Sequence, residues 1–186
     1  VYEVCDNGIP ILCDTATVTI TVAAQNDAPV IDLNGPAVGV DYAATFTEGT
    51  PVVIVDGAQL TVGDPDDTNI EGATVTVTNV LDAGVETLTA TTGATAITAN
   101  YVAPLLTMSG SDTLANYQQV LRTVTYNNTA PNPNPTARVV QFVVNDGTVA
   151  SAIATSTVTV NAINTAPSFT LPGNPSAVNE DAGVQT

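Results

Sequence analysis

The chain carries the same phrase twice, once near each end. Each copy has an acidic turn, a strand-like alternation of Thr with apolar residues, and a short segment ending in Ala-Pro. The copies lie at 6–8, 15–22 and 26–29, and at 146–147, 154–160 and 164–167. A recurring phrase of this kind is typical of tandem arrays of similar domains. We therefore expect one complete domain over 27–163, the C-terminal hairpin of a preceding repeat over 1–26, and the start of a following repeat over 164–186.

The composition favours strands over helices. Apolar residues make up 44% of the chain, but aromatic residues only 4%, and there is no Trp. Small and β-branched side chains suit pleated strands that form thin sheets packed face to face. Alternating patterns are separated by Gly, Asn, Asp and Pro, which predicts an all-β antiparallel sandwich or barrel. The expected strands lie at 2–5, 12–22, 52–55, 73–78, 86–90, 96–99, 105–108, 122–126, 139–144 and 154–160.

Two local features refine this expectation. The segments 86–90 and 96–99 flank Thr92-Gly93, as the strands of a hairpin would. The segment 112–121 instead places its apolar residues at helical spacing, and Asp112 or Thr113 could cap its start. We predict a short crossover helix there, at one end of the sandwich.

Charge is the next constraint. The chain has 18 acidic residues, two arginines, no Lys and no His, so its formal net charge is -16. This charge argues against nucleic acid as a partner and against anionic membranes, and no apolar run is long enough to span a bilayer. Repulsion among like charges destabilises a compact state, so bound cations are expected. The alternative is that the charge only keeps the protein soluble in a salty medium.

The residues needed for common enzyme chemistry are missing. There is no His or Lys to act as a base or amine, and both cysteines lie in one short stretch. The chain has no phosphate-binding Gly-rich loop, and nothing selects a pair of carboxylates for glycoside hydrolysis. We expect that the protein is not an enzyme.

The two cysteines, Cys5 and Cys13, flank a turn at 6–10 between two expected strands. Cysteines that face each other across a hairpin are close enough for a disulfide, which implies an oxidising compartment. The alternative is two unpaired thiols in a reducing cell. We favour the disulfide and expect the protein to be extracellular, at the cell surface or secreted.

Acidic and amide side chains gather in turns and linkers rather than in strands. The run Asp64-Pro65-Asp66-Asp67 has three carboxylates in four residues, and Asp6 and Asp146 lie in the repeated turns. Ca²⁺ prefers six to eight oxygen ligands from such side chains and from backbone carbonyls. The alternative is that each residue only caps a turn.

The segments 6–10, 14–22 and 26–29 resemble the end of a cadherin repeat, with its acidic turn, its Thr- and Val-rich last strand and its Asn-Asp-Ala-Pro linker. The segments 112–128 and 144–147 are similar to the cadherin-like tandem repeats of large bacterial surface adhesins. The resemblance implies a cadherin-like or Ig-like sandwich in a tandem array.

The same resemblance implies Ca²⁺ at the junctions between repeats. The upstream site would use Asn26, Asp27, Asp64, Asp66 and Asp146. The downstream site would use Glu48, Asn161 and Asn164. Asn stands at 161 and 164 where the family has Asp, and fewer charged ligands weaken calcium affinity. We therefore expect unequal junctions.

The resulting hypothesis is a structural or adhesive repeat that spaces its neighbours, with calcium stiffening the junctions. The partners would be neighbouring repeats of the same chain or identical subunits. One alternative is a module that binds a glycan, another protein or ice through its Thr-rich strands, such as 87–98. Another is a filament subunit whose hairpin, 1–22, joins a neighbour's sheet, because an isolated hairpin is marginally stable.

Overall fold

A computed structural model of the chain describes residues 1–163. The expected start of a following repeat, with Asn164, lies outside the described residues. The elements are β1 (Tyr2–Cys5), β2 (Cys13–Ala16), β3 (Val30–Asp32), β4 (Tyr42–Thr47), β5 (Val52–Val53), β6 (Thr61–Gly63), β7 (Asn69–Val77), β8 (Glu86–Thr89), β9 (Thr98–Val102), β10 (Leu105–Thr113), α1 (Leu114–Leu121), β11 (Thr125–Asn128), β12 (Arg138–Asn145) and β13 (Ala154–Asn161). Within 1–163, no helix is long and apolar enough to cross a membrane.

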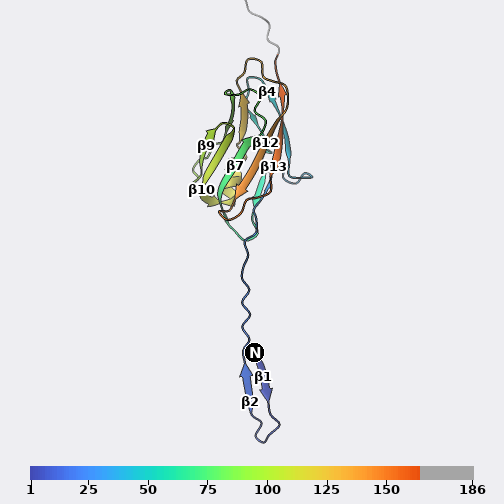
Figure 1. The fold of residues 1–186 in the computed structure, drawn as a ribbon, viewed down its shortest axis with the longest axis vertical. Helices are drawn as coiled ribbons and strands as arrows, with labels where there is room; N and C mark the ends of the chain where they lie inside the picture. The colour runs from blue at the N-terminus through green and yellow to red at the C-terminus, as the bar shows by residue number, and fades with distance from the viewer. Residues whose placement is uncertain (164–186) are drawn as a thin grey trace, which may run out of the picture.

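The strands form a β-sandwich, as the sequence predicts. One layer is a six-stranded sheet in the order β4-β13-β12-β7-β10-β9 (Figure 1). The three-stranded sheet β5-β11-β8 packs against its inner side, and the short pair β3-β6 lies beside it. The alternation seen in the sequence decides which side chains enter the space between the layers.

The core is made of these inward positions. In β12, Val140, Phe142 and Val144 are buried, and the residues between them are partly exposed. The ring of Phe46 from β4 meets that of Tyr126 from β11 edge to face, with centroids 5.3 Å apart. Full burial of each such side chain contributes about 1.5–3 kcal/mol, so the alternating strands hold the two layers together.

The pairing of β13 departs from the expected antiparallel pattern on one side. It runs antiparallel to β12 but parallel to β4, with Val158 beside Ala44. β4 and β13 are far apart in the sequence, so no short turn imposes an antiparallel arrangement. As a result the second copy of the repeated phrase is an interior strand with neighbours on both sides.

The expected hairpin around Thr92-Gly93 is wrong. β8 pairs with β11 in the three-stranded sheet, and β9 pairs with β10 in the six-stranded sheet. Leu88 before the turn and Ile97 after it are both buried in the core. The segment 90–97 therefore crosses from one layer to the other instead of turning back beside its own strand.

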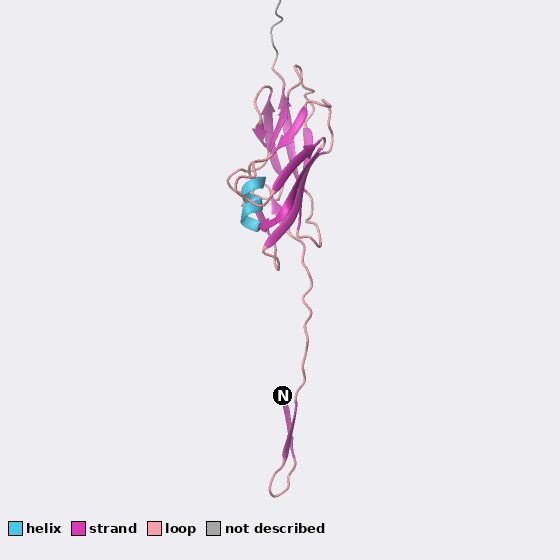
Figure 2. Ribbon diagram, turned by 90° about the vertical axis from the view of Figure 1, so that its left-hand side faces the viewer, coloured by secondary structure: helices cyan, strands magenta, loops and turns pink. Residues whose placement is uncertain are grey.

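The crossover helix is present as the sequence predicts. α1 follows β10 and leads to β11 in the other layer, and Figure 2 shows it at one end of the sandwich. The side chain of Thr113 caps it by accepting a hydrogen bond from the amide of Asn116. Tyr117 is fully buried, and its hydroxyl donates to the carbonyl of Gly110 at 2.7 Å.

The two arginines have different surroundings. Arg138 is fully buried and forms salt bridges with Asp82 at 2.7 Å and Glu86 at 2.9 Å. Arg122 donates from Nε and Nη2 to the carbonyl of Leu60. Removing one partner from a buried charge pair is strongly destabilising, so Arg138 is held inside the fold, whereas Arg122 is partly exposed.

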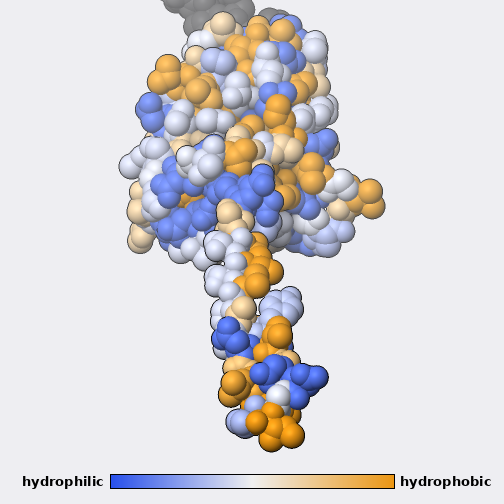
Figure 3. Space-filling model, turned by 60° about the horizontal axis from the view of Figure 1, so that its bottom comes forward, coloured by the Kyte–Doolittle hydropathy of each residue, from blue (hydrophilic) through white to orange (hydrophobic). Residues whose placement is uncertain are grey.

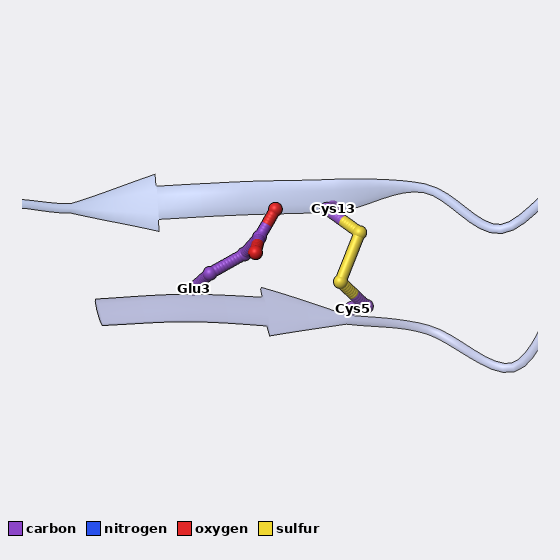
Figure 4. A group of neighbouring side chains, drawn as sticks. All are labelled: Glu3, Cys5 and Cys13. Atoms are coloured by element: carbon purple, nitrogen blue, oxygen red, sulfur yellow. A yellow bond between two sulfur atoms is a disulfide. The ribbon is translucent and has the colours of Figure 1, made fainter. Parts of the chain in front are cut away.

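The N-terminal hairpin lies away from the sandwich, at the end of an extended segment (Figure 1). β1 and β2 are antiparallel, with Cys5 opposite Cys13, and a disulfide joins the two residues (Figure 4). The expected return strand over 12–22 is shorter than predicted, because β2 ends at Ala16. Residues 17–22 have no strand partner among the described residues, and their side chains are exposed.

Candidate metal centre where the linker enters the sandwich

The end of the sandwich that receives residues 23–29 is called here the linker pole. Figure 3 views this end and shows hydrophilic residues gathered around the base of the linker. Its acidic side chains come from the 64–67 loop, between β6 and β7, and from the turn that follows β12. These two loops are far apart in the sequence, and the sheet topology brings them to the same end.

The 64–67 loop is folded around Asp64. One carboxylate oxygen of Asp64, Oδ1, accepts hydrogen bonds from the amides of Asp66 at 3.1 Å and Asp67 at 2.9 Å. Asp64 Oδ2 is buried and has no hydrogen-bond partner. Each of the three aspartates has a carboxylate oxygen within 4.8 Å of the others. Three carboxylates at this separation repel one another unless a cation or protons neutralise them.

The acidic turn after β12 supplies Asp146. This residue is 8% exposed, and its Oδ1 accepts from the amides of Thr148 at 2.6 Å and Val149 at 2.7 Å. The side-chain amide of Asn26 donates from Nδ2 to Asp146 Oδ2 at 2.8 Å. This hydrogen bond from Asn26, followed by the one from the amide of Val149, lowers the pKa of Asp146 below its usual range. Asp146 is therefore held as a carboxylate.

The linker makes a second contact with the pole through Asp27. Its backbone amide donates to both carboxylate oxygens of Asp66, at 3.2 and 3.3 Å. Desolvation, together with the nearby carboxylates of Asp64 and Asp27, raises the pKa of Asp66. The crowding of negative charge at this pole is therefore only partly relieved by hydrogen bonds.

The five residues expected at the upstream junction lie at the linker pole in two contacts, Asn26 with Asp146 and Asp27 with the loop of Asp64 and Asp66. Asn26 and Asp27 come from the linker, Asp64 and Asp66 from one loop, and Asp146 from another. Asp67 joins them, although it is not among the residues expected there. Its position in the same acidic run was the only sequence feature that could have indicated it.

The donor set fits a hard cation such as Ca²⁺. The pole offers carboxylate and amide oxygens, which Ca²⁺ prefers. The buried and unpartnered Asp64 Oδ2 is an oxygen that an ion could satisfy. The residues that would hold such an ion are Asp64, Asp66 and Asp67, with Asp27 bonded to Asp66 through its backbone amide and Asn26 bonded to Asp146.

The described residues expected at the downstream junction lie away from the linker pole. Glu48 Oε2 accepts from the amide of Ile163 at 2.9 Å, and the Glu48 amide donates to the Asn161 carbonyl at 3.1 Å. Two of the expected downstream residues, Glu48 and Asn161, are thus brought together. Glu48 supplies the single carboxylate of this pair, so the two sets of expected junction residues differ in charge.

The other acidic turn, in the N-terminal hairpin, has a local role. Asp6 Oδ1 accepts from the amides of Gly8 at 3.1 Å and Leu12 at 3.0 Å. These bonds, the one from Leu12 first, lower the pKa of Asp6. Glu3 lies near the two cysteines (Figure 4), but both sulfur atoms are in the disulfide, so this group offers no thiolate to a metal.

No protein-family model matches the chain, and no curated protein matches it. Among solved structures, a cohesin module from a family 33 glycoside hydrolase of Clostridium perfringens is similar, with a TM-score of 0.38 and 12% identity. The match covers 75% of this chain and 100% of that module. A likeness at this level carries no conclusion about function.

Proposed function

We propose that the chain is part of a tandem array of extracellular, cadherin-like β-sandwiches, in which it acts as a spacer whose upstream junction is stiffened by Ca²⁺. The observation that carries the proposal is the contact between the linker and the acidic pole. Asn26 and Asp27 are bonded to Asp146 and Asp66. The linker is thus fastened to carboxylates that a cation would neutralise.

The physical role of the ion follows from the charges. Without a cation, the carboxylates of Asp64, Asp66 and Asp67 repel one another at close range. A divalent ion replaces this repulsion with attraction. If the Asp27 carboxylate also binds the ion, this bond adds to the two hydrogen bonds that the Asp27 amide already donates to Asp66. The linker then loses rotational freedom relative to the sandwich. An array built from such units is a stiff rod, because successive domains cannot reorient freely about their linkers.

The test is a calcium titration of the intact protein, monitored by calorimetry for binding and by small-angle X-ray scattering for shape. Binding should be measurable at millimolar Ca²⁺ or below, and the scattering should show a longer, stiffer particle. The variant Asp64→Asn/Asp66→Asn should abolish both effects. Asp14→Asn is the matched control, since Asp14 is an exposed hairpin residue whose carboxylate bonds only to the neighbouring amide of Thr15.

The ion mechanism is overturned by a wild-type protein that binds no Ca²⁺ and keeps the same scattering profile in chelator and in millimolar Ca²⁺. The spacer role is tested separately. A protein made of several tandem copies should increase in maximum dimension by a constant amount per copy, and a collapsed particle would contradict it.

A second function is favoured by the exposed segment 17–22. Val18, Ile20 and Val22 are 60%, 82% and 87% exposed and alternate with threonines. Such a segment has the pattern of a strand that adds to another sheet, which suits a subunit joined to its neighbour by strand addition. Replacing Val18 and Ile20 with Ser should then abolish a polymer that forms in the wild-type protein.

A further inference from the structure

The outward side of the six-stranded sheet is almost without charge. The charged residues in its strands are Glu71 in β7, Asp112 in β10 and Arg138 in β12. Arg138 points inward and is fully buried. Glu71 lies next to Gly147 of the acidic turn, and Asp112 lies beyond a bulge in β10. Both acids lie toward the linker pole, although Glu71 also borders the cavity described below, and the other strand residues on this side are uncharged.

This neutral side is called here the open face. Rows of side chains run across it in register. In one row Val143, Thr74, Thr107 and Asn100 lie side by side on β12, β7, β10 and β9. The side chains of these rows are short and present both methyl groups and hydroxyls or amides, so the rows can be buried without stranding a charge if Glu71 stays at the edge of the contact.

The open face is also hollowed by a shallow cavity. A cavity of about 350 Å³ crosses β7, β10 and β12; Thr74, Thr107, Ser109, Val143 and Ala150 line it, and Glu71 is the charged residue of its lining. The three-stranded sheet and α1 lie on the other side of the six-stranded sheet (Figure 2). No described element covers the cavity or the rows around it.

We propose that the open face is a lateral contact through which a second copy of the chain packs side by side. The net negative charge of the chain favours this face as the place where two copies meet. Each copy has a net charge of -16; Arg138 is buried in its salt bridges, and Arg122 is partly exposed and donates to the carbonyl of Leu60. Two copies therefore repel each other over an acidic surface and can approach most readily where that surface is neutral.

The distances support a contact between neutral faces. Packed sheets lie about 10 Å apart, and interactions between exposed charges are screened over about 8 Å at physiological salt. Carboxylates at the linker pole and on the far side of the sandwich stay outside the contact. They set the alignment of the two copies by repulsion and do not prevent the approach.

The size of the open face fits a weak interface. Six strands about 4.8 Å apart and about eight residues long cover roughly 600–700 Å² per copy. This is the lower end of specific protein interfaces, which bury about 1,200 Å² or more in total. In an array, successive repeats would place such faces in series, and linked weak contacts strengthen one another.

A neutral sugar is a less suitable occupant. Sugar-binding faces commonly present aromatic rings for stacking, but the aromatic residues of these strands pack inward. Phe46 and Phe142 are fully buried, and Tyr42 and Tyr101 pack against the core. The open face therefore offers methyl groups and short polar groups, which match a second copy of itself.

The experiment is sedimentation equilibrium of the intact protein up to about millimolar concentration, at two salt concentrations. A reversible dimer is expected, and higher salt should strengthen it by screening the remaining repulsion. Thr74→Glu at the centre of the face should weaken the dimer at least tenfold. An equimolar mixture of Thr74→Glu and Thr74→Lys should restore association that neither variant shows alone.

Two controls separate this contact from other routes to association. Thr91→Glu adds the same charge at an exposed position outside the six-stranded sheet and should leave the dimer unchanged. Val18→Ser/Ile20→Ser removes the apolar side chains of the exposed N-terminal segment and should also leave it unchanged. Circular dichroism confirms that each variant is folded.

The proposal is overturned by a wild-type protein that stays monomeric at every concentration and salt, or by a dimer that Thr74→Glu leaves intact. A dimer lost in Val18→Ser/Ile20→Ser would instead assign association to strand addition. Binding of neutral glycans by a strictly monomeric protein would assign the open face to a different occupant. None of these outcomes depends on Ca²⁺ at the linker pole.

Discussion

The two copies of the repeated phrase have the same pattern and different structures. In the second copy, Val158 and Val160 of β13 are 0% and 3% exposed, between an antiparallel and a parallel neighbour. In the first copy, the corresponding residues Ile20 and Val22 are 82% and 87% exposed. The alternation specifies which side of a strand is to be buried, but burial requires a sheet on that side. The same alternating pattern is thus buried where a sheet and a second layer receive it, and exposed where they do not.

The largest expected effect comes from placing a charge at equivalent positions in the two copies. Val158→Asp should cost about 4 kcal/mol or more, because it buries an unpaired charge, and should prevent folding. Ile20→Asp should change the free energy of unfolding by no more than about 0.5 kcal/mol. Urea denaturation of both variants measures the difference. Equal destabilisation would show that the first copy is also packed in a sheet.

The second comparison is between the two linkers. With Ca²⁺ at about one hundred times its dissociation constant, binding stabilises the protein by about 2.7 kcal/mol. We expect this gain to disappear in chelator and in Asp64→Asn/Asp66→Asn, but to persist in Glu48→Gln at the other end. Thermal unfolding monitored by circular dichroism measures it. A gain that depends on Glu48 would reverse the expected order of the two junctions.

The third comparison concerns the acidic turns at low pH. The hydrogen bond from Asn26, with those from backbone amides, lowers the pKa of Asp146 in the folded protein. A lowered pKa contributes stability above the pKa of the unfolded chain, and this stability is lost as the pH falls through the folded pKa. We expect Asp146→Asn to reduce the acid sensitivity of the sandwich, seen in urea midpoints at pH 6 and pH 3.

Asp6 provides the matched case in the hairpin. Its pKa is also lowered, first by the amide of Leu12, but its bonds stay within the hairpin turn. Asp6→Asn should therefore leave the sandwich midpoint unchanged at both pH values. Asp66 acts in the opposite direction, because its pKa is raised and its protonation relieves repulsion as the pH falls. Carboxyl NMR titrations separate the three residues.

The smallest expected effect is reduction of the disulfide between Cys5 and Cys13. The disulfide lies in the hairpin, and the hairpin lies away from the sandwich (Figure 1). Local regions that share few contacts open independently. Reductant should loosen β1 and β2 and leave the unfolding midpoint of the sandwich within about 0.5 kcal/mol. A larger loss would show that the hairpin supports the sandwich.

Local patterns in the sequence predicted several of the strands and the helix. Period-two alternation located β12 and β13, and helical spacing after Asp112 located α1. The predicted hairpin at Thr92-Gly93 is wrong because these turn residues are compatible either with a hairpin or with a connection between the two layers. Burial of Leu88 and Ile97 favours the connection between layers. Turn chemistry acts over a few residues, whereas the choice of sheet depends on the whole core.

The candidate site shows the same division. The run Asp64-Pro65-Asp66-Asp67 is visible as a cluster in the sequence, since its members are neighbours. The association of Asn26 with Asp146 spans most of the chain, and from sequence it rested only on a family resemblance. The ion itself remains a proposal, for which calcium titration is the direct measurement.

The sequence by itself determined the β-rich class, the alternation of inward and outward side chains, the short helix and the excess of negative charge. Those properties depend on residue type and on spacing along the chain. The tertiary structure alone decided that β13 has a parallel neighbour, that Arg138 is buried between Asp82 and Glu86, and that the outward side of the six-stranded sheet has its acids only toward the linker pole. These properties depend on which distant segments pack together, and packing is settled by the burial of the whole core.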